Sequence, residues 1–132
     1  MRSRTIAAKL LVTSRTAVSL SHPDRVGLIA PLPEGASLAG SLDAAMVGLV
    51  FADSAAALSA VLEANRTALT QPGAFWVLYP KANRIDVNRD TLWPMLSAYG
   101  MRPIAQVAID EVWSALRFRA LNAGEGPFHR DR

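Results

Sequence analysis

AAMVGLVFADSAAALSAVL, residues 44–62, is the segment that is most informative about the fold. Its first part, residues 44–52, is continuously apolar, which is typical of a strand buried on both faces of a parallel sheet. Asp53 or Ser54 follows as a candidate N-cap of a helix. The apolar residues of this helix recur on one helical stripe: Leu58, Val61, Leu62 and Leu69. The stretch therefore predicts a central strand and an amphipathic helix, which Gln71-Pro72-Gly73 ends.

The same alternation of apolar runs and helical segments extends in both directions along the chain. Further strands are predicted at residues 17–20, 26–30, 74–79, 103–109 and 112–119. Further helices are predicted at residues 5–11 and 91–99, the second with Thr91 as N-cap and Gly100 as C-cap. The adjacent acids Asp110 and Glu111 join the last two strands. This order predicts an α/β fold, with a mostly parallel sheet, helices on both faces and a C-terminal antiparallel β-hairpin.

Length and composition bound the protein to a single domain. The chain has 132 residues, 51% of them hydrophobic and 19% charged, with no cysteine. We expect a lead-in over residues 1–25, one domain over residues 26–120 and a flexible tail over residues 121–132. The absence of cysteine excludes a disulfide scaffold and a thiolate metal site. Since no apolar run approaches about 18 residues, we expect no membrane partner and a cytoplasmic location.

The formal net charge of +3 is unevenly distributed. Residues 26–80 hold four carboxylates against Arg66, whereas basic residues gather at the N-terminus, near residues 81–102 and at the C-terminal end. Clustered arginines such as Arg2 and Arg4 can neutralise phosphates. A net charge of +3 is weak support for such a role, so nucleic acid is not the expected partner.

The order of elements resembles the second half of the class I methyltransferase type of Rossmann fold. Leu69-Thr-Gln-Pro-Gly73 is similar to a turn that those enzymes commonly carry. More narrowly, a family of small uncharacterised bacterial proteins is similar in Tyr79-Pro-Lys81, in Arg89-Asp90 with Trp93, and in residues 106–119, QVAIDEVWSALRFR. The resemblance covers about residues 25–120. It implies a reduced Rossmann-like fold and no particular activity.

The sequence departs from methyltransferases where their cofactor binds. The family places S-adenosylmethionine on a glycine-rich loop after the first strand, with an acidic residue after the second. Here the strand predicted at residues 26–30 leads into Pro31-Leu-Pro-Glu-Gly35, which has no G-x-G. Glycine permits close backbone approach to a ligand, and two prolines do not. We therefore expect no cofactor.

The polar segment 81–90, KANRIDVNRD, is the main candidate site, because it leaves the carboxyl end of a predicted strand. The candidate ligand-binding residues are Lys81, Asn83, Arg84, Arg89, Asp90 and Trp93. The cations suit a phosphate or carboxylate, aided by the N-terminus of the next helix. The alternative is structural: Lys81 or Arg89 pairs with Asp86, Asp90 or Asp110, and Asp90 caps the helix. The sequence leaves both interpretations open and favours the structural one.

Other reactive side chains do not form a recognisable catalytic set. His22 and His129 have no partner at ligand spacing and are expected to be solvated, so we predict no metal site. Asp110 and Glu111 are expected to point apart in a turn. Of the tryptophans, Trp76 is predicted to be core, and Trp93 and Trp113 to pack. No catalytic residue is predicted.

These observations favour a non-catalytic interaction or regulatory module. We expect that the module forms a homodimer. The interface would be an exposed sheet edge, with residues 26–30 near it, or the apolar N-terminal helix. The alternative function is binding of a small anionic ligand or nucleotide at the Lys81–Asp90 loop.

Overall fold

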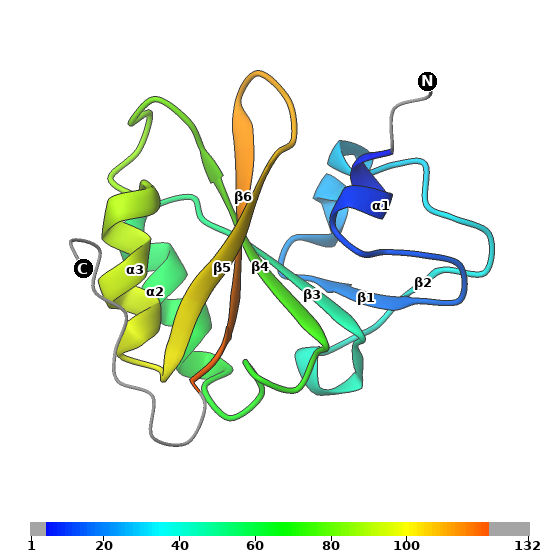
Figure 1. Ribbon diagram of the computed structural model, residues 1–132, viewed down its shortest axis with the longest axis horizontal. Coiled ribbons are helices and arrows are strands. Elements are labelled where there is room, and N and C mark those ends of the chain that lie inside the picture. The colour runs from blue at the N-terminus through cyan, green and yellow to red at the C-terminus, as the bar shows by residue number, and fades with distance from the viewer. Residues whose placement is uncertain (1–4, 122–132) are drawn as a thin grey trace.

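The computed structural model describes residues 5–121, which form one six-stranded sheet flanked by helices (Figure 1). The strands are β1 (Ala17–Leu20), β2 (Ser37–Leu38), β3 (Val47–Phe51), β4 (Ala74–Pro80), β5 (Met101–Ala108) and β6 (Trp113–Ala120). The α-helices are α1 (Ile6–Lys9), α2 (Ala55–Ala64) and α3 (Arg89–Ser97), and the 3-10 helices are η1 (Pro23–Leu28) and η2 (Leu42–Ala44). Arg2, Arg4, His129 and residues 122–132 of the predicted tail lie outside the described residues.

The strands are arranged in the order β2-β1-β3-β4-β6-β5. The first four run parallel, and β6 runs antiparallel to both β4 and β5. The predicted mostly parallel sheet with a C-terminal antiparallel hairpin is confirmed. The order reverses at β1, because β2 pairs with one side of β1 and β3, the next strand in the chain, pairs with the other. Open α/β sheets bind ligands outside the carboxyl ends of the strands at such a switch point.

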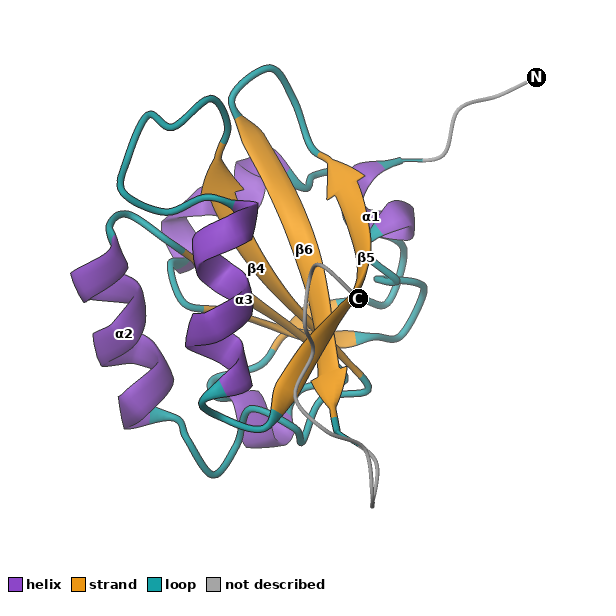
Figure 2. Ribbon diagram, turned by 60° about the vertical axis from the view of Figure 1, so that its left-hand side comes forward, coloured by secondary structure: helices purple, strands orange, loops and turns teal. Residues whose placement is uncertain are grey.

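Helices cover both faces of the sheet, as predicted. Helices α2 and α3 lie side by side on one face (Figures 1 and 2), where Leu62 and Leu96 join a core that includes Val77. Helix α1 and the segment around η1 cover the other face, where Leu10 packs in a core with Trp76. Successive residues of β4 alternate between the two cores, which explains why the whole strand is apolar.

The predicted helix after β3 is confirmed, but its cap and its end differ in detail. Ser54 is the N-cap, and its Oγ accepts a hydrogen bond of 3.0 Å from the backbone amide of Ala57. The helix ends at Ala64, although the apolar stripe predicts a continuation to Leu69. Asn65 is the C-cap: its backbone amide donates to the carbonyl of Val61 at 3.1 Å, and its side-chain Nδ2 donates to the same carbonyl at 2.9 Å. Leu69 is still buried, in the turns that follow.

Helix α3 begins earlier than predicted. Asn88 is the N-cap, and it forms a reciprocal capping box with Thr91, the residue predicted to be the cap. Pro94 lies inside this helix, beyond its first turn. Gly100 follows the helix with φ +76, a conformation that glycine adopts without steric cost.

The strand predicted at residues 26–30 is wrong. Residues 23–28 form η1, and Ile29 and Val26 pack on the α1 face of the sheet instead of pairing in it. The edges of the sheet are β2 and β5. A short apolar run fits a strand and a buried helical turn equally well, and Pro23 starts the helical turn here.

The predicted N-terminal helix is confirmed as α1, which Thr5 caps through a hydrogen bond of 3.1 Å from the amide of Ala8. Across residues 5–121, the helices are all too short or too polar to cross a membrane.

Candidate functional site

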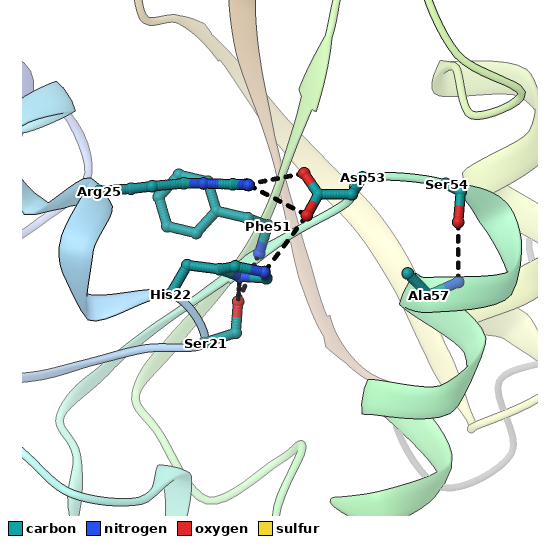
Figure 3. A network of polar contacts seen from close by, with 7 residues as sticks. All are labelled: Ser21, His22, Arg25, Phe51, Asp53, Ser54 and Ala57. Atoms are coloured by element: carbon teal, nitrogen blue, oxygen red, sulfur yellow. Dashed lines mark hydrogen bonds and ion pairs between the residues drawn. The ribbon is translucent and has the colours of Figure 1, made fainter.

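A network of side chains occupies the switch point of the sheet (Figure 3). Ser21 and His22 directly follow β1, and Arg25 comes from η1. Asp53 lies two residues beyond the end of β3, just before α2. The carboxyl ends of β1 and β3 are neighbours in the sheet, so residues about thirty positions apart in sequence meet here.

The pair of Arg25 and Asp53 is the centre of this network. Arg25 Nη1 lies 2.8 Å from Asp53 Oδ1, and Nη2 donates to Oδ2 at 3.0 Å. The guanidinium carbon also lies 5.4 Å from the ring centre of Phe51 and 5.6 Å from that of Trp113, within the range of cation–π attraction. Arg25 therefore joins η1 to the ends of β3 and β6 by charge and by stacking.

His22 connects the ion pair to the backbone of the sheet. Its Nδ1 lies 2.9 Å from Ser21 Oγ, and its Nε2 lies 3.3 Å from Asp53 Oδ2. Ser21 Oγ in turn accepts a hydrogen bond of 2.8 Å from the backbone amide of Phe51. The His22 side chain is 30% exposed, and it has two side-chain partners that the sequence does not predict.

The hydrogen bond from Arg25 lowers the pKa of the Asp53 carboxyl below its ordinary value. Partial burial opposes this effect, and the charges of Arg25 and His22 add to it. The carboxylate is therefore held ionised by its neighbours. An ionised acid bound to a guanidinium suits a structural lock better than proton transfer, which needs a group that titrates near the working pH.

The sequence analysis missed this network, although part of its signal was present. The sequence predicts Asp53 only as a candidate helix cap and His22 only as a solvated histidine. The sequence does show polar residues directly after two buried strands. These residues predict a shared site only if β1 and β3 are known to be neighbours in the sheet. The first strand beside the switch point is β1, so the segment that corresponds to the cofactor loop is Ser21–Arg25 and not the predicted Pro31–Gly35. Ser21–Arg25 also contains no glycine.

The predicted residues of the 81–90 loop mostly bond one another or nearby backbone. Lys81 Nζ donates to the carbonyl of Asp110 at 2.6 Å, and Arg84 Nη1 donates to the carbonyl of Lys81 at 3.0 Å. Asn88 Nδ2 donates to Asn83 Oδ1 at 2.9 Å. These bonds fold the loop back against the β5–β6 turn.

Arg89, Asp90 and Trp93 lie on α3. Arg89 Nη1 donates to Gln106 Oε1 at 3.1 Å, and its guanidinium carbon lies 5.8 Å from the ring centre of Trp93. Trp93 packs against the core, as predicted. Within residues 5–121 no carboxylate lies within 4.0 Å of the charged nitrogens of Lys81, Arg84 or Arg89, so the expected ion pairs of the structural alternative do not form.

The loop carboxylate of Asp86 has a structural partner instead. Its Oδ1 accepts a hydrogen bond of 2.7 Å from the backbone amide of Ala55, the first residue of α2. A carboxylate at this position satisfies a free amide and complements the helix dipole. Asp86 therefore ties the loop to the start of α2.

A cavity of about 470 Å³ lies between this loop and the sheet. It is lined by Tyr79, Lys81, Ala82, Gln106, Ala108 and Ser114. Of the candidate ligand-binding residues, only Lys81 lines it. The other polar members are not predicted from the sequence, because they lie within strands. The available signal is a glutamine and a serine, Gln106 and Ser114, that interrupt the two apolar strands of the predicted hairpin.

The remaining groups singled out in the sequence have structural positions. Asp110 Oδ1 accepts hydrogen bonds from the amides of Val112 and Trp113 at 2.8 and 2.7 Å, which shapes the β5–β6 turn. Trp76 is 2% exposed, so its predicted place in the core is confirmed, and its Nε1 donates to the carbonyl of Leu10. In the part of the chain that the structure describes, no three histidine or acidic side chains converge on a possible metal position.

Two solved structures that are similar to this chain support the fold. A protein of the NADB-Rossmann superfamily from Streptococcus agalactiae is 10% identical with a TM-score of 0.54, over 98% of this chain and 72% of that one. The fold is Rossmann-like. A candidate tRNA (m1A22) methyltransferase of Streptococcus pneumoniae is 13% identical with a TM-score of 0.50, over 88% of this chain and 55% of that one. The chain thus spans about half the length of that protein. No protein-family model and no curated protein matches the sequence.

Proposed function

We propose that this protein is a non-catalytic interaction or regulatory module built on a degenerate methyltransferase-like fold. The observation that carries the proposal is the ion pair of Arg25 and Asp53 at the switch point of the sheet. Rossmann-like proteins place their ligands in this crevice. Here the chain's own side chains bridge it.

The surroundings of the pair reinforce this interpretation. The Arg25 guanidinium is held by two carboxylate oxygens and by the rings of Phe51 and Trp113, so a ligand would have to displace several favourable contacts. The segment that follows β1 has Pro23 where close backbone approach to a phosphate requires glycine. Both features disfavour a nucleotide-type cofactor at this position.

Calorimetry and thermal unfolding with S-adenosylmethionine test the proposal. A ligand at about 100 times its Kd raises the free energy of unfolding by about 2.7 kcal/mol, which thermal unfolding detects readily. We expect no heat of binding and no shift in Tm for the natural sequence at millimolar ligand. A saturable binding isotherm would overturn the proposal, and Arg25→Ala would then show whether the ion pair contributes to that site.

A second copy of the chain is the partner that we propose first. Among residues 5–121, strand β5 pairs only with β6 and stands at an edge of the sheet, and its Ile104 is 42% exposed. Free edges tend to pair with another strand or to be blocked. Light scattering of the full chain at high micromolar concentration should give the mass of a dimer. A strict monomer at this concentration would rule out a second copy as the partner. If a dimer forms, its loss in Ile104→Lys would locate the interface at β5.

A second candidate function is binding of a small anionic ligand or nucleotide beside the Lys81–Asp90 loop. The observation that favours it is the cavity of about 470 Å³ that Lys81 lines. A thermal-shift screen with nucleotides and phosphorylated metabolites tests this function. Stabilisation that is lost in Lys81→Ala supports it, whereas no stabilisation at millimolar concentration contradicts it. Arg84→Ala serves as the neighbouring comparison, because Arg84 does not line the cavity.

A further inference from the structure

The cavity beside the loop brings together polar groups from three adjacent strands. Tyr79 lies on β4, Gln106 on β5 and Ser114 on β6, and Tyr79 is directly opposite Ser114 in the sheet. Tyr79 and Ser114 are only 5% and 3% exposed. Polar groups buried to this extent need hydrogen-bond partners, so the direction of each bond can be followed from one group to the next.

Arg89 determines the direction of the first bond. A guanidinium only donates hydrogen bonds, so the Gln106 atom that lies 3.1 Å from Arg89 Nη1 has to be the carbonyl oxygen, Oε1. The amide nitrogen of Gln106 then faces the cavity. It donates to Tyr79 Oη at 3.1 Å and to Ser114 Oγ at 3.2 Å. Both amide hydrogens are used, and both hydroxyl oxygens act as acceptors.

The hydroxyl hydrogens are therefore left to donate elsewhere. Among the described residues, Tyr79 Oη has no acceptor for its hydrogen, and Ser114 Oγ has only the carbonyl of Val107 at a long 3.4 Å. Lys81 Nζ uses one of its three N–H groups on the carbonyl of Asp110. The side-chain hydrogens that remain to donate at the cavity, among the described residues, are thus those of the Tyr79 and Ser114 hydroxyls and of the charged Lys81 ammonium.

We propose that this cavity binds the oxyanion group of a small ligand, a carboxylate or a phosphate, through the Tyr79 hydroxyl, the Ser114 hydroxyl and the Lys81 ammonium. We assign Arg89 as a positioning residue. It orients the Gln106 amide so that its nitrogen donates to both hydroxyl oxygens, which leaves the hydroxyl hydrogens free to donate to the ligand. The inference rests on the second candidate function and names its ligand chemistry. Oxyanions match the site because they accept several hydrogen bonds and carry the charge that complements Lys81.

Calorimetric titration with inorganic phosphate and with acetate tests the inference in the full chain. We expect the natural sequence to bind at least one of them, and the comparison of the two shows which oxyanion the cavity prefers. Tyr79→Phe and Lys81→Met should each weaken binding about tenfold, the effect of losing one hydrogen bond to a charged group. Lys9→Met is the matched control, since Lys9 is the other lysine of the chain and lies on α1.

The Gln106→Glu variant tests the polarity argument directly. A carboxylate keeps the contact with Arg89 but can only accept, so it draws both hydroxyl hydrogens away from the ligand and repels it. We expect anion binding to be lost while the unfolding curve keeps its cooperativity. Gln71→Glu makes the same change of charge at an exposed position and should bind as the natural sequence does.

The role of Arg89 is separable from a merely structural one. Arg89→Met frees Gln106 to turn its oxygen toward the hydroxyls, so anion binding should weaken, whereas Arg89→Lys retains a donor and should largely restore it. If neither phosphate nor acetate binds the natural sequence, the inference fails, whereas the second candidate function fails only if the thermal-shift screen with nucleotides and phosphorylated metabolites also shows no stabilisation. If they bind and Tyr79→Phe and Gln106→Glu leave the affinity unchanged, only the inference is overturned.

Discussion

Asp53 and Ser54 are adjacent in the sequence and have different partners in the structure. Ser54 bonds the amide of Ala57, three residues later, whereas Asp53 bonds Arg25, which lies 28 residues earlier. The first interaction follows from local helix geometry and is predictable from the sequence. The second requires that β1 and β3 lie side by side, so the sequence shows only that an acid is present.

The cap of α2 gives a prediction at this scale. Ser54→Ala removes the oxygen that accepts the Ala57 amide, so the free energy of unfolding should fall by about 1 kcal/mol. Urea unfolding followed by circular dichroism measures the change. Ser59→Ala, at an exposed position within the same helix, is the control and should have little effect. An equal loss in both variants would contradict the capping role.

The Asp53 ion pair gives a prediction of pH dependence. The pKa of the folded-state carboxyl is lowered below 3.8, so the pair stabilises the protein above that value and loses its effect as the pH falls through the folded-state pKa. Asp53→Asn should therefore reduce stability at neutral pH and make little difference at a pH acidic enough to protonate the folded-state carboxyl. The effect is expected to be modest, because the Asp53 side chain is 44% exposed.

Denaturant unfolding at several pH values, with Glu34→Gln as an exposed carboxylate control, measures this difference. A difference between Asp53→Asn and the natural sequence that stays constant from neutral to acidic pH would show that the carboxylate charge is not what stabilises the network.

At the scale of elements, long patterns are reliable guides and short ones are not. The apolar strands β3 and β4 and the amphipathic part of α2 lie where the sequence predicts them. The run at residues 26–30 is only five residues long and is not a strand, because burial against α1 satisfies it as well as pairing does. The site residues on strands, Gln106 and Ser114, escape prediction since they interrupt otherwise apolar runs without forming a motif.

The attachment of α1 to the sheet can be tested through Trp76. Its indole Nε1 donates to the carbonyl of Leu10 at 3.0 Å, where both groups are buried. Trp76→Phe leaves that carbonyl without its partner and creates a small cavity, so stability should fall by about 1–3 kcal/mol. Amide exchange should rise most in residues 6–12. Trp93→Phe, on α3, is the control. A specific attachment would be contradicted if amide exchange in residues 6–12 rose equally in both variants.

At the scale of the whole molecule, two apolar cores share one sheet. Because alternate residues of β3 and β4 belong to opposite cores, neither core can unfold while the other keeps these strands in place. The protein should therefore unfold in a single cooperative transition. Leu62→Ala on one face and Leu10→Ala on the other should each cost about 2–5 kcal/mol and lower the same Tm. Scanning calorimetry measures this, and two resolved transitions in either variant would contradict it.

The alternation of strands and helices, the α/β class, the helix at Ser54 and the lack of a glycine-rich loop are all readable from the chain, because periodicity and capping are local interactions. Three features emerge only in three dimensions: β1 lies between β2 and β3, Arg25 pairs with Asp53, and Gln106 bonds both Arg89 and Tyr79. Strand order depends on which buried faces pack best together, and short apolar runs do not encode that choice. The convergence of polar side chains follows from strand order, so it became visible only in three dimensions.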